Sequence, residues 1–364
     1  MNPSLREETE KLTRSWMRHD SEMLRDYLVA EVEDPRVNLQ SIFTRHFLAW
    51  ELFGDRFEPL MREEYRFSAV MNSLRRLAGR FGDAEERDAV LHALRQGADN
   101  AEGLEIPQHI VQAYASLPRS APVATIPNYI QEFLERWAPG PSAKMGDEAS
   151  LNTFQDLWRS LLLPGRGAPA GVSQPEPLAS NAADAARTAP PSVLEPACGS
   201  ANDYRFLERY GFAARIAYSG FDLCPKNVEN ARRMFPGTAF NAGNVFEIDA
   251  PGLSFDYCFV HDLFEHLSPE GIETAVREVC RVTRKAMCAH FFSMDEIREH
   301  VIQPVDDYHW NLLSMERMRG LFSSYGFEAQ VFHLGTFLLQ RAGAGDYHNP
   351  TAYTFLLRRR TSYS

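Results

Sequence analysis

The sequence has little cysteine, no excess of basic residues and no long apolar run. Its 364 residues include five cysteines, and none forms a Cys-x-x-Cys pair, so neither a disulfide framework nor a zinc site is indicated. Such cysteine usage is typical of the reducing cytoplasm, which is the expected location. No apolar stretch approaches the roughly 20 residues of a membrane-spanning helix, and the polar residues 1–10 do not resemble a signal peptide.

The charge balance is acidic. The chain has 38 Lys and Arg against 49 Asp and Glu, which gives a formal net charge of −11. A protein that holds nucleic acid through its phosphates normally presents a positive field, so a nucleic-acid partner is not expected. The basic run at 358–360 is short and is interpreted as a solvated end.

The sequence pattern of the first 140 residues or so predicts helices. Apolar residues recur at helical spacing from Leu5 to Trp137, and almost no stretch alternates with period two. We therefore expect an all-α N-terminal domain over residues 1–140 that serves as a lid, a homodimer contact or a substrate-selection element. One more helix is expected at 151–163, followed by a Pro- and Ala-rich linker up to residue 191.

From residue 192 the sequence pattern changes to short β-rich segments that alternate with helical segments. Such alternation predicts an α/β, Rossmann-like doubly wound sheet over residues 192–364. Ligands of these sheets bind outside the carboxyl ends of the strands. The expected strands are 193–194, 216–221, 238–240, 255–260, 286–292, 329–334 and 353–357, and the expected helices are 203–210, 226–234, 272–282 and 314–325.

Several strand ends carry residues suited to a nucleoside cofactor. The first strand runs into EPACGSAND at 195–203, a turn of small residues that lets a ligand approach the backbone closely. Asp222 ends the second strand, where a carboxylate can accept ribose hydroxyls or cap the next helix. A dinucleotide is not favoured, because the turn lacks the G-x-G-x-x-G pattern that cradles a pyrophosphate.

Together these segments resemble the class I S-adenosylmethionine-dependent methyltransferases of small-molecule type over residues 192–360. The resemblance is carried by the first turn, by GFDL at 220–223, by AGNV at 242–245 and by HDLFEHL at 261–267. Two of the family's three glycine positions hold alanine here. The resemblance implies a seven-stranded methyltransferase sheet, S-adenosyl-L-methionine as cofactor, and cofactor contacts from Glu195, Ala197, Gly199, Ala201, Asp222, Leu223, Asn244, Val245 and His261.

The resemblance also implies methyl transfer to an oxygen, nitrogen or carbon nucleophile of a small molecule, in specialised metabolism. His309 is the first candidate for proton acceptance or substrate contact, with packing as the alternative, and His261 is the second. Substrate contacts are expected from Tyr308, Trp310 and His266, of which the first two could stack on a flat acceptor. We expect no metal, since no set of oxygen ligands with recognisable spacing is present.

Two other functions stay open at this point. A protein or RNA methyltransferase would use the helical domain to bind its macromolecule. A non-catalytic scaffold with a methyltransferase fold is the other alternative, and the two alanines of the first turn motivate it.

Overall fold

The computed structural model describes residues 1–18, 39–62, 64–65, 153–163, 189–342 and 349–360. The helices expected between 66 and 140 and most of the expected linker lie outside these residues. A helical N-terminal segment is confirmed for the part described, which contains α1 (Pro3–Arg18), α3 (Leu39–Phe53) and the short helix η1 (Gly54–Phe57).

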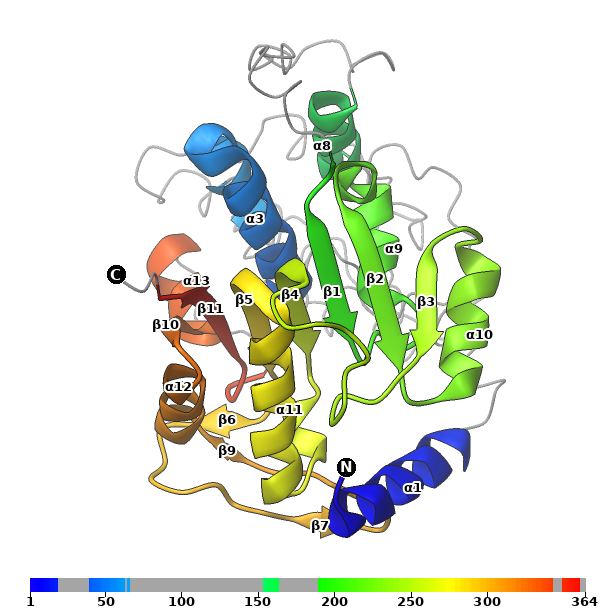
Figure 1. Ribbon diagram of the computed structural model, residues 1–364. Coiled ribbons are helices and arrows are strands. Elements are labelled where there is room, and N and C mark those ends of the chain that lie inside the picture. Colours follow the sequence, from blue (N-terminus) through cyan, green and yellow to red (C-terminus); the bar gives the residue numbers. More distant parts are fainter. Residues whose placement is uncertain (19–38, 63, 66–152, 164–188, 343–348, 361–364) are drawn as a thin grey trace, which may run out of the picture.

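A seven-stranded sheet in the order β10-β11-β5-β4-β1-β2-β3 forms the centre of the molecule (Figure 1). Neighbouring strands are parallel, except that β11 runs antiparallel to both β10 and β5. The doubly wound sheet predicted from the sequence is thereby confirmed. The strands are β1 (Ser192–Pro196), β2 (Ala217–Asp222), β3 (Ala239–Ala242), β4 (Phe255–His261), β5 (Thr283–Phe291), β10 (Phe327–His333) and β11 (Tyr353–Arg359).

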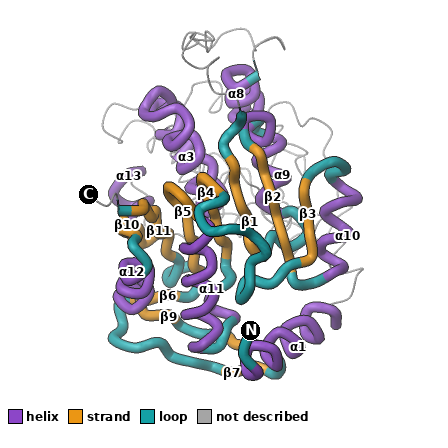
Figure 2. Tube along the Cα trace, in the orientation of Figure 1, coloured by secondary structure: helices purple, strands orange, loops and turns teal. Residues whose placement is uncertain are grey.

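The strand order reverses between β1 and β4. From β1 the chain proceeds outward to β2 and β3, and then returns to β4 and β5 on the other side of β1. In such sheets, ligands bind beside the carboxyl ends of the strands at this reversal. Figure 2 shows the loops that leave these strand ends, on the side of the sheet where α1 lies.

Helices cover both faces of the sheet, and each face has its own apolar core. One core joins residues of α3 and α8 (Thr153–Leu162) to α9 (Asn202–Arg209) and α10 (Pro225–Met234). The other joins α1 to α11 (Pro269–Val282) and α12 (Met315–Ser324). Helix α3 thus packs against β5 and β11 of the sheet, whereas α1 packs beside α11 and β8, past the carboxyl ends of the central strands (Figure 1).

A buried ionic cluster fixes α3. The Glu64 carboxylate accepts hydrogen bonds from Arg45 Nη2 at 2.6 Å and from Trp158 Nε1 of α8 at 3.0 Å, and it lies 2.7 Å from His46 Nε2. Burial opposes ionisation of Glu64, but the charge of Arg45 and the hydrogen bond of His46 lower its pKa to about 2. Removing one partner from such a cluster leaves an uncompensated buried charge.

Some short elements were not predicted from the sequence. Strands β6 (Met294–Asp295) and β9 (Leu313–Ser314) form a two-stranded parallel pair, and β7 (Pro304–Val305) and β8 (Tyr308–His309) form an antiparallel one. Helix α13 (Leu334–Ala342) follows β10 directly. The expected helix start at Ser314 is confirmed, because its hydroxyl accepts a hydrogen bond from Arg317 N.

All five cysteines are free and buried. In the described ranges, no helix combines the length and apolar character that a membrane crossing requires.

Candidate functional site

The loop after β1 contains three residues with left-handed backbone. Ala197, Gly199 and Ala201 have φ of 54°, 53° and 68°, and they occupy the positions that resemble the family's three glycines. This conformation costs an L-residue roughly 1–2 kcal/mol, whereas glycine adopts it freely. The alanines therefore keep a glycine-type loop at a conformational cost.

Asp222 connects this loop to the end of β2. Its Oδ2 accepts a hydrogen bond from Gly199 N at 2.9 Å, and its Oδ1 accepts from Cys224 N at 2.8 Å and from Asn227 Nδ2 at 3.1 Å. The carboxylate is nearly buried, and burial raises its pKa although all three donors oppose this. Leu223, the next residue, packs partly buried against the core that α1 shares.

Glu195 points into the protein interior. It is buried, and Tyr218 Oη donates a hydrogen bond to its Oε2. Burial raises the pKa of Glu195 well above its usual range, and the negative charge of Asp203 acts in the same direction. Gly220 makes room for this pair, because a Cβ there would lie 2.5 Å from Tyr218 Oη.

The segment after β3 lies under α1. Asn244 Oδ1 accepts a hydrogen bond from Phe246 N, and Asn244 Nδ2 donates to Thr9 Oγ1 of α1, both at 2.9 Å. Val245 is buried in the core that contains α1. Both residues expected near adenine thus lie after β3, and Thr9 of α1 contacts Asn244.

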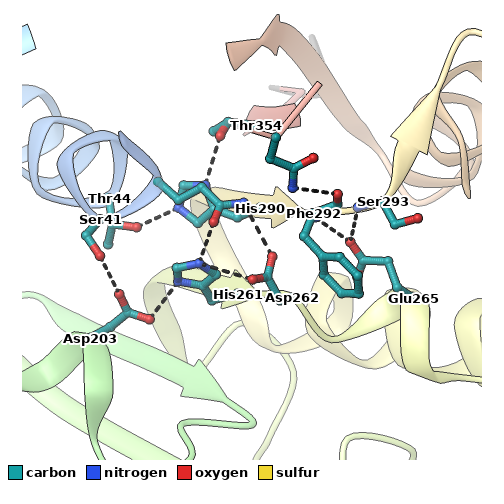
Figure 3. Close-up of polar contacts among 12 residues, drawn as sticks. Ser41, Thr44, Asp203, His261, Asp262, Glu265, His290, Phe292, Ser293 and Thr354 are labelled. Carbon is teal, nitrogen blue, oxygen red and sulfur yellow. Dashed lines mark hydrogen bonds and ion pairs between the residues drawn. The ribbon is translucent and has the colours of Figure 1, made fainter. Parts of the chain in front are cut away.

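His261 ends β4 at the centre of a polar group (Figure 3). Its Nδ1 lies 2.8 Å from Asp203 Oδ2, and its Nε2 lies 2.9 Å from Gln40 Oε1 and 3.5 Å from Asp262 Oδ2. Ser41 also donates to Asp203, at 3.3 Å. Burial opposes the charge of Asp203, but His261 outweighs it and lowers the pKa of this carboxyl.

A second histidine supports this group from β5. His290 is fully buried, with Thr44 Oγ1 at 2.6 Å from its Nε2 and Thr354 Oγ1 at 2.9 Å from its Nδ1. Burial and the neighbouring His261 hold the pKa of His290 well below its usual range, so a neutral ring is favoured. Because both ring nitrogens have partners, His290 is a core residue that connects α3 to β5 and β11.

The loop after β4 is ordered by Glu265 and His266. Glu265 Oε1 accepts from Phe292 N at 2.8 Å and from Ser293 N at 3.4 Å, and burial raises its pKa to about 8 (Figure 3). His266 Nδ1 lies 3.1 Å from the carbonyl oxygen of His309. These contacts hold the loop against the segment that contains β8.

His309 lies beside α1, in a different group from His261. Its Nδ1 is buried and has no hydrogen-bond partner in the described part of the chain, and burial lowers its pKa. Tyr308 and Trp310 form aromatic contacts with His266, at centroid distances of 5.8 and 5.5 Å. Trp310 is 48% exposed, so part of its ring is accessible.

The structure thus brings the predicted cofactor residues to one edge of the sheet, with His261 beside the first loop, but the side chain of Glu195 points into the interior instead. Sequence reasoning missed Asp203, Gln40 and Ser41 as members of this group. Asp203 could have been found from the sequence, because it is an acidic residue at a helix start directly after the small-residue turn. No sequence pattern marks Gln40 or Ser41 as part of this group. Among the residues described, no cluster of three or more His, Cys, Asp or Glu side chains is suited to hold a metal ion.

Comparison with known proteins supports the assignment of the fold. Residues 193–286 match the family model of a methyltransferase domain. No curated protein sequence matches the chain.

Several solved methyltransferase structures are similar at low identity. One is the 1,6-didemethyltoxoflavin-N1-methyltransferase of Burkholderia thailandensis, 18% identical, with a TM-score of 0.35 over 48% of this chain and 72% of that one. Another is the magnesium protoporphyrin IX methyltransferase of Synechocystis, 13% identical, with a TM-score of 0.35 over 49% and 74% of the two chains. These similarities are too distant to transfer a substrate or a residue role.

The match of the family model begins within β1 and ends within β5. It therefore spans the loops after β1, β2, β3 and β4, which are the segments that carried the resemblance in the sequence. The complete sheet also has the seven strands that the resemblance implied, and its last strand, β11, is antiparallel to both neighbours. The domain built on this sheet is a methyltransferase domain, and its fold is consistent with the class I S-adenosylmethionine-dependent methyltransferases.

Proposed function

We propose that this methyltransferase acts on a small molecule, and that His261, paired with Asp203, accepts the proton that the methyl acceptor loses. The observation that carries the proposal is the 2.8 Å contact between His261 Nδ1 and Asp203 Oδ2. His261 ends β4 and Asp203 lies in the first turn of α9, so the pair lies at the strand-order reversal, where ligands of this fold bind.

The residues present fit S-adenosylmethionine, which supplies a methyl group on a sulfonium sulfur that becomes a neutral thioether on transfer. A Cβ on Gly199 would meet no described atom nearer than 3.8 Å, so the loop backbone is open there. Asp222 already accepts three hydrogen bonds. A carboxylate has about four acceptor positions, which leaves one for a ribose hydroxyl. Asn244 and Val245 would meet the adenine.

His261 and Asp203 would act as a base and its orienting partner. With Nδ1–H donated to Asp203, the neutral ring has its lone pair on Nε2. The acceptor's proton would move to Nε2 as its nucleophilic atom bonds to the methyl carbon, and Asp203 would stabilise the imidazolium that results. The lowered pKa of Asp203 supports this role, because the carboxylate stays ionised.

Burial and charge support a small acceptor. Asp203 and Asp222 are 7% and 8% exposed, and Asp203 accepts a hydrogen bond from Ser41 of α3. Among the described residues at this edge of the sheet, Asp203 stays ionised, and its negative charge disfavours a phosphate backbone. The half-exposed Trp310 offers an apolar face on which a flat acceptor could stack.

His309 remains the alternative proton acceptor in this proposal. Its Nδ1 is buried without a hydrogen-bond partner in the described residues, which suits a ring that gains a partner from the acceptor. Its partly exposed neighbours Tyr308 and Trp310 would then form the acceptor's contact surface.

Calorimetry with S-adenosylmethionine and S-adenosylhomocysteine, with NAD as control, tests the cofactor first. Micromolar binding of the first two alone is expected, whereas no binding would favour a scaffold. Metabolite pools, total RNA and total protein are then incubated with methyl-labelled cofactor. Label in the metabolite fraction supports the proposal, and label confined to RNA or protein overturns it. His261→Asn should then lower turnover far more than His309→Gln if His261 is the base.

A further inference from the structure

Gln40 contacts the proposed base although it comes from the N-terminal segment. It lies in the first turn of α3, is 7% exposed, and places its Oε1 2.9 Å from His261 Nε2. Its Nε2 donates to Asp262 Oδ1 at 3.4 Å. Gln40 therefore bridges the two residues that end β4 and begin the next loop.

The chemistry of the amide fixes the proton on His261 Nε2. A carboxamide oxygen only accepts hydrogen bonds and the carboxamide nitrogen only donates them. Burial raises the pKa of Asp262, whereas the charge of His261 opposes this shift. In its ionised form Asp262 selects the orientation of Gln40, because the reverse orientation would set the amide oxygen against a carboxylate. The amide oxygen then faces His261, so Nε2 must carry a hydrogen to form this bond.

Both ring nitrogens of His261 therefore face acceptors. Asp203 faces Nδ1, while Gln40 and Asp262 face Nε2. Two further titratable groups lie near the ring: His290 of β5, at a centroid distance of 4.9 Å, and Glu195 of β1. His290 is neutral and Glu195 is favoured in its neutral form, so neither offsets this arrangement.

We propose that Gln40 is a positioning residue for His261: oriented by Asp262, its carboxamide holds a proton on Nε2 and sets the pH above which His261 can accept one. The inference rests on the proposed function, in which Nε2 receives the acceptor's proton. It assigns to α3 a part in the chemistry beyond packing, because the acceptor's donor group must replace Gln40 at Nε2.

Histidine titration by NMR tests this without a known acceptor. The full chain is labelled with ¹⁵N-histidine, and the His261 signal is identified by its loss in His261→Asn. Gln40→Met removes the amide oxygen at similar side-chain volume. The titration midpoint of the His261 ring should then fall by about one pH unit, because the lost hydrogen bond stabilises the charged ring more than the neutral one. In Gln40→Glu it should rise, since a carboxylate replaces the amide.

Gln155→Met is the matched control, because Gln155 is also buried, at 8% exposure, but lies in α8. Its His261 midpoint should equal that of the wild type. An unchanged midpoint in both Gln40 variants, with thermal unfolding still cooperative, would overturn the proposal. Loss of folding in Gln40→Met leaves Gln40→Glu to decide, by the direction of its shift.

Binding of S-adenosylhomocysteine separates this inference from the proposed function. If the compound binds wild type and both Gln40 variants equally, the cofactor site is intact in the variants, and a shift of the His261 titration midpoint reports on the ring itself. If it binds none of them, the proposed function fails, while the histidine titration still decides whether Gln40 controls His261.

Discussion

Asn244 Nδ2 donates a 2.9 Å hydrogen bond to Thr9 Oγ1, which joins the loop after β3 to the first helix of the chain. A second contact acts nearby, where Glu8 accepts from Ser268 N at 2.6 Å at the start of α11. An acidic side chain at a helix N-terminus is favoured by the helix dipole. Helix α1 is therefore held across the expected adenine site by specific polar bonds as well as by Leu5 and Leu12.

Thr9→Val should loosen α1 without unfolding the sheet. Valine keeps the shape of threonine but cannot accept the Asn244 bond, so about 1 kcal/mol of local stability should be lost. Hydrogen exchange followed by mass spectrometry should show faster exchange in α1 and unchanged exchange in β1 and β4. Thr13→Val is the control, since within the described residues the Thr13 hydroxyl bonds to its own helix alone, at Thr9 O. Equal effects in both variants would show that the Asn244 bond contributes nothing.

Asp222→Asn should weaken the binding of S-adenosylhomocysteine by at least tenfold. The substitution keeps the side-chain size but removes the charge that would hold a ribose hydroxyl, and hydrogen bonds to charged groups are worth about 1.5–3 kcal/mol. Calorimetry measures the loss, and the exposed Asp249→Asn is the control. Undiminished affinity would mean that the ribose lies elsewhere.

Ala197→Gly should stabilise the protein by about 1 kcal/mol, because glycine removes the cost of a left-handed L-residue. The control Ala214→Gly, at an exposed position of the helix Phe212–Arg215, should instead be neutral or destabilising. Denaturant unfolding compares the two. A loss of stability in Ala197→Gly would show that the alanine side chain contributes more by packing than its backbone costs.

Glu265 should make the protein less stable as the pH rises. Its folded pKa of about 8 lies above the usual 4.5, so its stabilising contribution is complete below about pH 4.5 and is lost as the pH rises through 8. Glu265→Gln keeps an acceptor for Phe292 N and should flatten this slope in unfolding experiments between pH 5 and 8. The exposed Glu270→Gln should retain the wild-type slope. Identical slopes in all three proteins would contradict a buried neutral Glu265.

Glu64→Gln should destabilise the fold by about 3 kcal/mol, because it breaks the buried ion pair between Glu64 and Arg45. The folded pKa of Glu64, about 2, lies below the usual 4.5. Its contribution is therefore present above pH 4.5 and is lost as the pH falls towards 2. Denaturant unfolding of wild type and variant should converge on acidification across this window. A constant difference would place the effect in packing instead of charge.

The sheet could be predicted from the sequence because its signals are local. Each of the expected strands from 193 to 357 corresponds to a strand of the sheet, and Ser314 marked the start of α12 by its capping position. Helix α13 was missed because its apolar residues directly continue those of β10. The paired strands of two residues, such as β8, are too short to produce a periodic pattern.

The site could be predicted only where its residues lie in the family's motifs. His261 and Asp222 belong to such motifs and end the strands as expected. Gln40 approaches His261 across 221 residues of sequence, and Ser41 approaches Asp203 across 162. No local pattern encodes such contacts, because they depend on how α3 packs against the sheet. The left-handed φ of Ala197 and Ala201 likewise follows from the loop's surroundings, since alanine itself favours other conformations.

The position of β11 has a consequence for the order in which the chain can fold during synthesis. This strand lies between β10 and β5, so β5 keeps an open edge and β10 has no neighbour in the sheet until residues 353–359 emerge. An unpaired edge is a template for pairing with another chain. His290, which contacts Thr44 of α3, also depends on this strand, because Thr354 of β11 is its second hydrogen-bond partner. A growing chain that already contains every residue of the proposed catalytic group would therefore still lack Thr354, the hydrogen-bond partner of the histidine that packs against His261.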